Sequence, residues 1–177
     1  MLTIYLCGFM GCGKSTVGKA LAERLGHNNH SAFPFIDLDE YIVKREGRSI
    51  KNIFDMDGEE YFRKLEIKCM LELSNNGGVI ALGGGTILSE EASRAANASG
   101  EVVFINTPFE VCYERIMKED LGRGRPLVMT KSRIELENLY AERASVYVSH
   151  SSLSVDGDAE VQLVVQRIID SLSNPSV

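Results

Sequence analysis

The chain alternates short apolar runs with segments in which apolar residues recur every three or four positions. The short runs are rich in β-branched or aromatic residues, which favours buried strands. We expect strands at 2–7, 33–38, 79–82, 101–106 and 152–155. The segments in which apolar residues recur every three or four positions predict helices at about 14–25, 39–46, 58–74, 90–98, 132–148 and 161–172. A further helix is expected to start at 107.

Several of these helices have end signals in the sequence. Gly26 is a candidate C-cap of the first helix, and Asp57 can cap the long helix that begins near Gly58. Thr107, followed by a proline, has the pattern of a helix start.

Strands that alternate with helices predict right-handed crossovers and a parallel sheet covered on both faces. The expected fold class is α/β, with three α/β/α layers and a central five-stranded parallel sheet. No repeat, low-complexity tract or linker divides residues 1–177, so we expect a single domain.

Composition narrows the functional classes. The chain is 44% hydrophobic and 25% charged, as in ordinary globular proteins. Its 19 basic and 25 acidic residues give a net charge of −6, which argues against non-specific nucleic-acid binding. No apolar run approaches the roughly 20 residues that span a bilayer, and the N-terminus lacks the features of a secretion signal. We expect a cytoplasmic chain without membrane partners, and a monomer as the default for this size.

The spacing of the cysteines argues against a metal centre. Cys7, Cys12, Cys69 and Cys112 form no CxxC or Cys/His cluster, so zinc is not expected. Free thiols, buried or partly buried, are the simplest interpretation.

One motif predicts specific chemistry. Residues 8–15, GFMGCGKS, match G-x-x-x-x-G-K-[ST] and lie between a predicted strand and a predicted amphipathic helix, as that motif requires. Backbone N–H groups of such a P-loop converge on phosphate oxygens at a helix N-terminus. We expect Lys14 to reach the β- and γ-phosphates of a nucleotide and the Ser15 hydroxyl to bind Mg²⁺. A glycine turn that binds nothing is the alternative, and the flanking strand and helix argue against it.

A second segment resembles a GTPase element. Residues 55–59, DMDGE, contain D-x-x-G, but they follow no convincing buried strand, and no Asn-Lys-x-Asp element occurs in the chain. We therefore reject the GTPase interpretation.

Two carboxylates follow the second predicted strand, at the edge where open parallel sheets bind ligands. The spacing of Asp37 and Asp39 can send both to one side if the strand persists. One could hold Mg²⁺ through water, and the other could accept the proton of a phosphate-accepting hydroxyl. The alternative for Asp39 is an ordinary helix N-cap.

Arginines beside apolar stripes are candidate carboxylate ligands. Arg63 lies on the long helix, and Arg143 lies between Tyr140 and Tyr147. Each can clamp a carboxylate in bidentate fashion, or can instead snorkel or pair, as Arg63 can with Glu66 at i, i+3.

Two loops complete the set of candidates. Arg125 lies in an aperiodic loop at about 119–131 that could close over phosphates as a lid, or could be a solvated basic loop. Gly83-Gly84-Gly85 ends a predicted strand and permits either close approach of a ligand or a tight turn.

Taken together, these residues resemble the shikimate kinase family, within the nucleoside-monophosphate-kinase-like P-loop fold. The resemblance runs in order through nearly the whole chain. It rests on the P-loop, Asp37-x-Asp39, Gly58-Glu59-x-x-Phe62-Arg63-x-x-Glu66, the triple glycine, Arg125-Pro126-Leu127 and Arg143-x-x-x-Tyr147. The P-loop is generic, whereas the combination of the others is much more specific.

The resemblance implies ATP-dependent phosphorylation of the shikimate 3-hydroxyl, with Mg²⁺, in aromatic amino-acid biosynthesis through chorismate. The implied catalytic residues are Lys14, Asp39 and Arg125, with Asp39 as base and Arg125 on the lid. The implied nucleotide ligands are Gly11, Cys12, Gly13, Lys14, Ser15, Thr16, Arg125 and, beside adenine, Arg115. The implied shikimate ligands are Asp39, Arg63, Gly84, Gly85 and Arg143, in a region that includes residues 38–74; the implied metal ligands are Ser15 and Asp37. Asp156-Gly157-Asp158 is acidic where the family often has an Arg/Asn/Pro-rich turn.

Other functions stay open at this point. Gluconate or another small polyol acid would also suit two arginines, whereas a nucleoside-monophosphate kinase is disfavoured because no second nucleobase-reading element is recognisable. A non-catalytic nucleotide-binding regulatory protein would keep the fold, but intact Lys14, Asp39, Arg63 and Arg125 argue against it.

Overall fold

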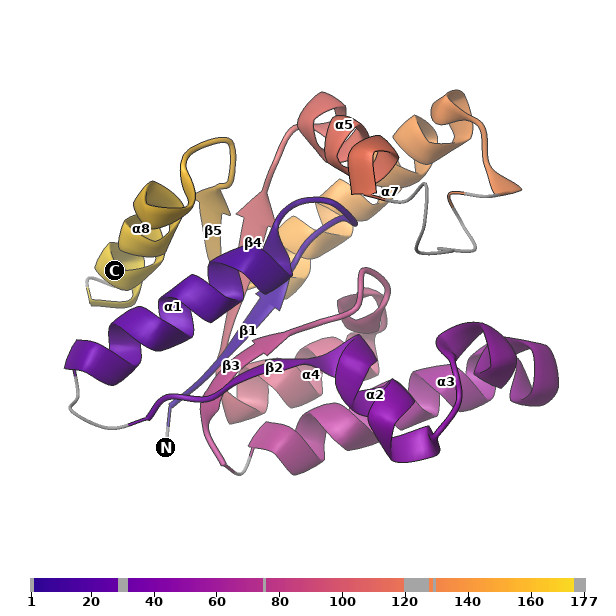
Figure 1. Cartoon of the computed structure of the whole chain (residues 1–177), viewed down its shortest axis with the longest axis horizontal. Helices are drawn as coiled ribbons and strands as arrows, with labels where there is room; N and C mark the ends of the chain where they lie inside the picture. The colour runs from indigo at the N-terminus through magenta and orange to yellow at the C-terminus, as the bar shows by residue number, and fades with distance from the viewer. Residues whose placement is uncertain (1, 29–31, 75, 120–127, 129, 174–177) are drawn as a thin grey trace.

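A single parallel sheet organises the computed structural model of the chain, which describes residues 2–28, 32–74, 76–119, 128 and 130–173. Its five strands run in the order β2-β3-β1-β4-β5 (Figure 1). They are β1 (Thr3–Cys7), β2 (Phe35–Asp37), β3 (Gly78–Ala81), β4 (Glu101–Asn106) and β5 (Leu153–Asp156). The predicted α/β class with a five-stranded parallel sheet is confirmed.

Strand β1 forms the centre of this sheet. Leu6 lies opposite Ala81 of β3 on one side and opposite Val103 of β4 on the other. All five residues of β1 are buried, because helices cover both faces of the sheet. A strand buried on both faces has no polar side, which explains the continuous apolar run in the sequence.

The helices form a layer on each face of the sheet. On one face, α1 (Lys14–Asn28) packs against α8 (Val161–Ser173) (Figure 1). On the other lie α3 (Ile50–Ser74), α4 (Glu90–Ser99) and α7 (Arg133–His150), with α2 (Leu38–Glu46) packed against α3. Helix α5 (Phe109–Glu119) follows β4. In the part of the chain that the structure describes, no helix is both long and apolar enough to cross a membrane.

One predicted helix end is wrong, and one helical segment was not predicted. Helix α1 continues through Gly26 to Asn28, because one interior glycine costs a helix only about 1 kcal/mol; in the last turn His27 Nδ1 lies 2.8 Å from the Glu23 carbonyl oxygen. Helix α3 consists of two helical segments that meet at Gly58, so the predicted start near Gly58 holds for the second segment, whereas the first, from Ile50, was missed. Asp57, the predicted cap, pairs with Arg48 at 2.5 Å. A short 3₁₀ helix, η1 (Thr86–Leu88), was not predicted.

The backbone of α3 leaves helical geometry at one residue, Gly58, where φ is 83° and ψ is 170°. This conformation is essentially restricted to glycine. It kinks the helix before Glu59 and Arg63, and therefore sets the direction from which Arg63 approaches the sheet.

We predict that Gly58→Asn lowers the free energy of unfolding by about 1–3 kcal/mol. The matched control is Gly47→Asn at the C-cap of α2, where φ is 66° and ψ is 16°. Asparagine tolerates that left-handed conformation, and a Cβ has open space at both positions, so the control should change stability by less than about 0.5 kcal/mol. Urea denaturation measures both values. Equal losses would contradict the assignment of the cost to the Gly58 backbone.

Candidate active site

The carboxyl ends of the three strands β1, β2 and β3 open onto a cavity of about 690 Å³. Every described residue that the sequence placed at a ligand site lines it. These residues are Gly11, Cys12, Gly13, Lys14, Ser15, Thr16, Asp37, Asp39, Arg63, Gly84, Gly85, Arg115 and Arg143. The predicted lid arginine, Arg125, and most of the predicted lid lie outside the described residues.

The P-loop connects buried β1 to the first turn of α1. Lys14 Nζ donates hydrogen bonds to the carbonyl oxygens of Gly8 (2.9 Å) and Phe9 (3.1 Å). Arg115, on α5, donates to the carbonyl oxygens of Gly11 and Cys12, both at 3.3 Å. The side chains of Lys14 and Arg115 thus donate hydrogen bonds to carbonyl groups of this loop. The backbone N–H groups of the loop can then donate to an anion.

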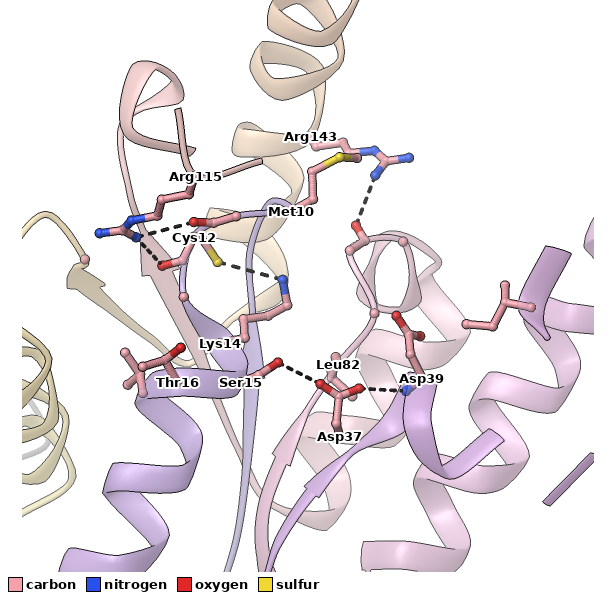
Figure 2. A pocket seen from close by; sticks show the side chains of 18 of the residues that line it. Met10, Cys12, Lys14, Ser15, Thr16, Asp37, Asp39, Leu82, Arg115 and Arg143 are labelled. Atoms are coloured by element: carbon pink, nitrogen blue, oxygen red, sulfur yellow. Dashed lines mark hydrogen bonds between the residues drawn. The ribbon is translucent and has the colours of Figure 1, made fainter. Parts of the chain in front are cut away.

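Ser15 and Asp37 join the P-loop half of the cavity to its other half. The Ser15 hydroxyl donates to Asp37 Oδ2 at 2.7 Å, across 22 positions of sequence (Figure 2). Asp37 Oδ1 accepts from the N–H groups of Asp39 (3.1 Å) and Glu40 (3.3 Å), so Asp37 is the N-cap of α2.

This geometry corrects two expectations about the aspartate pair. Strand β2 ends at Asp37, so Asp37 and Asp39 do not share one side of a continuing strand. The N-cap alternative for Asp39 is also wrong, because Asp37 fills that role. A carboxylate at the end of the strand satisfies N–H groups that the first helical turn leaves unbonded, and this favours helix immediately after it.

The two oxygens can take part in binding a hard cation. Among the described residues, no group of three or more His, Cys, Asp or Glu side chains gathers around a possible metal position. The Ser15 hydroxyl oxygen and the Asp37 carboxylate oxygen lie 2.7 Å apart. Two such ligands suit Mg²⁺, because this ion keeps several waters and takes its other oxygens from substrate phosphates.

The buried carboxylate of Glu66 organises a second group of polar residues, which includes Arg63 of the cavity lining. Glu66 is 1% exposed, and it accepts hydrogen bonds from Arg63 Nη1 (2.5 Å) and Thr86 Oγ1 (2.6 Å). Burial raises the pKa of the Glu66 carboxyl above its ordinary value of 4.5, although Arg63 and Thr86 act in the opposite direction. The predicted pairing of Arg63 with Glu66 is confirmed, and Arg63 also lines the cavity.

The triple glycine lets these polar groups approach the backbone closely. A Cβ at Gly85 would lie 2.7 Å from Arg63 Nη1, and one at Gly83 would lie 2.9 Å from both Asp39 Oδ1 and Glu66 Oε1. Larger residues there would displace the charged groups. The turn after β3 therefore belongs to the site.

Arg143 reaches the same turn from α7. Its Nη1 donates to the Gly84 carbonyl oxygen at 3.3 Å (Figure 2). The Tyr147 hydroxyl donates to the same oxygen at 2.5 Å. Arg63 and Arg143 thus come from different helices and both line the cavity beside the Gly83–Gly85 turn.

The acidic turn at residues 156–158 lies at the P-loop side of the cavity. Gly157 and Ala159 line the cavity together with Arg115. The Asp156 carboxylate pairs with Arg167 at 3.0 Å and accepts from the Asp158 N–H at 2.9 Å. One of the two acidic side chains is thus engaged within its own turn and with α8.

Thr107 was missed as a site residue. The sequence marked it only as a helix start, whereas its hydroxyl donates to the Cys12 carbonyl oxygen at 3.1 Å. Its partner is 95 positions away, so no local sequence pattern signals this contact.

The sheet order and the P-loop define the chain as a P-loop kinase. The family model described as shikimate kinase matches residues 10–173. The chain is 42% identical to shikimate kinases of Persephonella marina, covering 93% of this chain and 95% of that one, and Aquifex aeolicus, covering 97% and 96%. The chain belongs to the shikimate kinase family.

Solved structures agree with this assignment. The crystal structure of Aquifex aeolicus shikimate kinase has a TM-score of 0.79 at 41% identity, covering 99% of this chain and 98% of that one. Acinetobacter baumannii shikimate kinase, in complex with shikimate, has a TM-score of 0.87 at 29% identity, covering 100% and 96%. A gluconokinase from Sinorhizobium meliloti has a TM-score of only 0.53 at 18% identity, over 99% and 98%, which shows a shared fold alone.

We predict that Glu66→Gln changes how stability depends on pH. Because the pKa of Glu66 is raised by folding, the unfolded chain loses this proton near pH 4.5 while the folded chain still holds it. As pH rises above about 4.5, the native protein should therefore lose stability relative to the Gln variant.

Urea denaturation between pH 4 and 8 measures this difference. Glu59→Gln is the control, because it removes a carboxylate from the same arginine at a position that is 67% exposed. The difference in free energy of unfolding between Glu66→Gln and the native protein should change with pH. A difference that stays constant from pH 4 to 8 would contradict a pKa of Glu66 raised by burial.

Proposed function

We propose that the chain is a shikimate kinase, which transfers the γ-phosphate of ATP to the 3-hydroxyl of shikimate and releases shikimate 3-phosphate and ADP. This reaction belongs to aromatic amino-acid biosynthesis through chorismate. One observation carries the proposal: a single cavity has a P-loop on one side and, on the other, two arginines near Asp39. The relatives named shikimate kinase, and the related structure in complex with shikimate, support the same acceptor.

Each side of the cavity suits one substrate. The P-loop N–H groups and Lys14 suit the phosphates of ATP, and Arg115 suits a position beside adenine. Arg63 and Arg143 suit the shikimate carboxylate, since arginine binds carboxylates through two parallel hydrogen bonds. Gly84 and Gly85 give that acceptor close access to the backbone.

We assign the proton transfer to Asp39. As the 3-hydroxyl oxygen forms its bond to the γ-phosphorus, the bond from that phosphorus to the β,γ-bridging oxygen breaks, and the hydroxyl proton passes to the Asp39 carboxylate. Lys14 and Arg125, on a lid at about 119–131, balance the negative charge on the phosphoryl oxygens. Closure of that lid would exclude water, which otherwise competes as acceptor.

Mg²⁺ is the proposed metal cofactor, with Ser15 and Asp37 as its protein ligands. When bound, it neutralises phosphate charge. The hydrogen bond between the two residues supports the assignment, because it brings a hydroxyl oxygen and a carboxylate oxygen within 2.7 Å of each other.

The other expectations follow from the same assignment. We propose one domain over residues 1–177, acting as a monomer on small molecules and not on nucleic acid, in keeping with the net charge of −6. Four free, buried cysteines suit a reducing compartment, and we propose the cytoplasm.

A coupled assay of ADP release tests the proposed function. MgATP is combined with shikimate, gluconate, AMP or no acceptor at matched concentrations. Release that depends on shikimate alone is expected. ADP release with gluconate alone would favour a kinase for gluconate or another small polyol acid. Binding of ATP without any acceptor-dependent ADP release would favour a regulatory protein.

We predict that Arg63→Ala raises the KM for shikimate by about 100-fold, the effect of losing a charge-assisted ion pair, and changes the KM for ATP less than threefold. Arg63→Lys keeps the charge beside Glu66 but loses the planar fork, so it should show much of the same defect in a folded protein. Lys64→Ala, on the exposed side of the same helix, is the control. Equal increases in both KM values would contradict the clamp.

We predict that Asp37→Asn raises the free Mg²⁺ concentration that gives half-maximal activity by about tenfold, because a neutral amide binds a hard cation less well than a carboxylate does. Asparagine is a good N-cap, so helix α2 and the melting temperature should change little. Activity measured against free Mg²⁺ at fixed ATP tests this, and an unchanged requirement would remove Asp37 from the metal site.

A further inference from the structure

Thr107 lies directly behind the P-loop, between the end of β4 and the start of α5. It is 1% exposed, and its hydroxyl donates to the Cys12 carbonyl oxygen at 3.1 Å. Its own carbonyl oxygen accepts from the Tyr140 hydroxyl at 3.0 Å and from the Cys112 thiol at 3.5 Å. A buried residue whose side chain and backbone carbonyl are both hydrogen-bonded has little freedom to move.

The Cys12 carbonyl group controls one of the N–H groups of the loop. In a planar trans peptide, the C=O of one residue and the N–H of the next point in opposite directions. The Cys12 carbonyl oxygen is directed at the Thr107 hydroxyl. The Gly13 N–H is therefore directed away from Thr107, and Gly13 itself lines the cavity.

A second donor to the same carbonyl is weaker. Arg115 reaches the Cys12 carbonyl oxygen at 3.3 Å, but it divides its Nη1 between this oxygen and that of Gly11 and is only partly buried. Thr107 is β-branched and restricted at χ1, so its hydrogen bond is made with little loss of side-chain entropy. The turn at Gly157 closes over the hydroxyl, since a Cβ there would collide with Thr107 Oγ1.

We propose that Thr107 is a positioning residue for the nucleotide: its hydrogen bond to Cys12 fixes the Cys12–Gly13 peptide so that the Gly13 N–H is aligned to bind phosphate. Thr107 touches neither substrate and acts through the loop. This inference rests on the proposed function for its kinetic readout, but not for its binding readout, because the affinity for ADP can be measured without any acceptor.

Thr107→Val tests the proposal, since it keeps the shape of the side chain and removes the hydroxyl. We expect ADP affinity, measured by calorimetry, to fall about three- to tenfold, the range for loss of one hydrogen bond. The KM for ATP should rise by a similar factor while the KM for shikimate stays unchanged. Thr107→Ser should restore both values.

The chain offers a matched control in Thr3. Thr3 is also 1% exposed and donates its hydroxyl hydrogen to a backbone carbonyl oxygen, that of Ser74, at 3.0 Å. It lies at the start of β1, the end of that strand opposite the P-loop. Thr3→Val should lower the melting temperature by a similar amount and leave ADP affinity unchanged.

Three outcomes would overturn the proposal. They are native ADP affinity in Thr107→Val, an equal loss of affinity in Thr3→Val, and failure of Thr107→Ser to restore affinity. If the native chain binds ADP but does not phosphorylate shikimate, the proposed function fails and the binding test of Thr107 still stands.

Discussion

Strand β1 lies in the centre of the sheet with every residue buried, and the P-loop begins where this strand ends. Hydrogen bonds to β3 and β4 on either side fix the register of β1, and therefore the position at which the P-loop begins. Because all strands are parallel, Asp37 at the end of β2 and the triple glycine after β3 reach the same edge. The positions of phosphate ligands, carboxylates and arginines relative to one another all depend on this buried strand.

Two sets of hydrogen bonds orient the groups that line the two sides of the cavity. On the P-loop side, Thr107 and Arg115 hold carbonyl groups of the P-loop. On the side of the triple glycine, Glu66 holds Arg63 and Thr86. In both sets a buried polar group aligns another group that lines the cavity, and low exposure strengthens these bonds. The Ser15–Asp37 hydrogen bond connects the two sides.

The sequence predicted the features that depend on local pattern. The P-loop, the apolar strands and the apolar stripe of α3 each have a period or spacing that a single segment contains. The candidate residues could be grouped because the ends of parallel strands meet at one edge. The family resemblance supplied the pairing of Arg63 with Arg143, which lie 80 positions apart.

Features that depend on distant contacts were not predictable in this way. The helical segment that begins at Ile50 was missed, because Gly58 interrupts the helical pattern and separates it from the segment that carries Arg63. The sequence offered Asp39 as an alternative helix N-cap, and Asp37 takes that role because β2 ends there. Thr107 resembled a local helix start, since its partner Cys12 lies 95 positions earlier in the chain.

We propose that one cavity holds ATP and a carboxylate-bearing acceptor together, and that Arg63 and Arg143 bind the carboxylate. A comparison of shikimate with its methyl ester as acceptors, at saturating MgATP, tests this. We expect kcat/KM for the ester to be lower by about 100-fold or more, because a neutral ester cannot replace a carboxylate between two arginines. An ester phosphorylated as efficiently as shikimate would show that the two arginines do not bind the carboxylate.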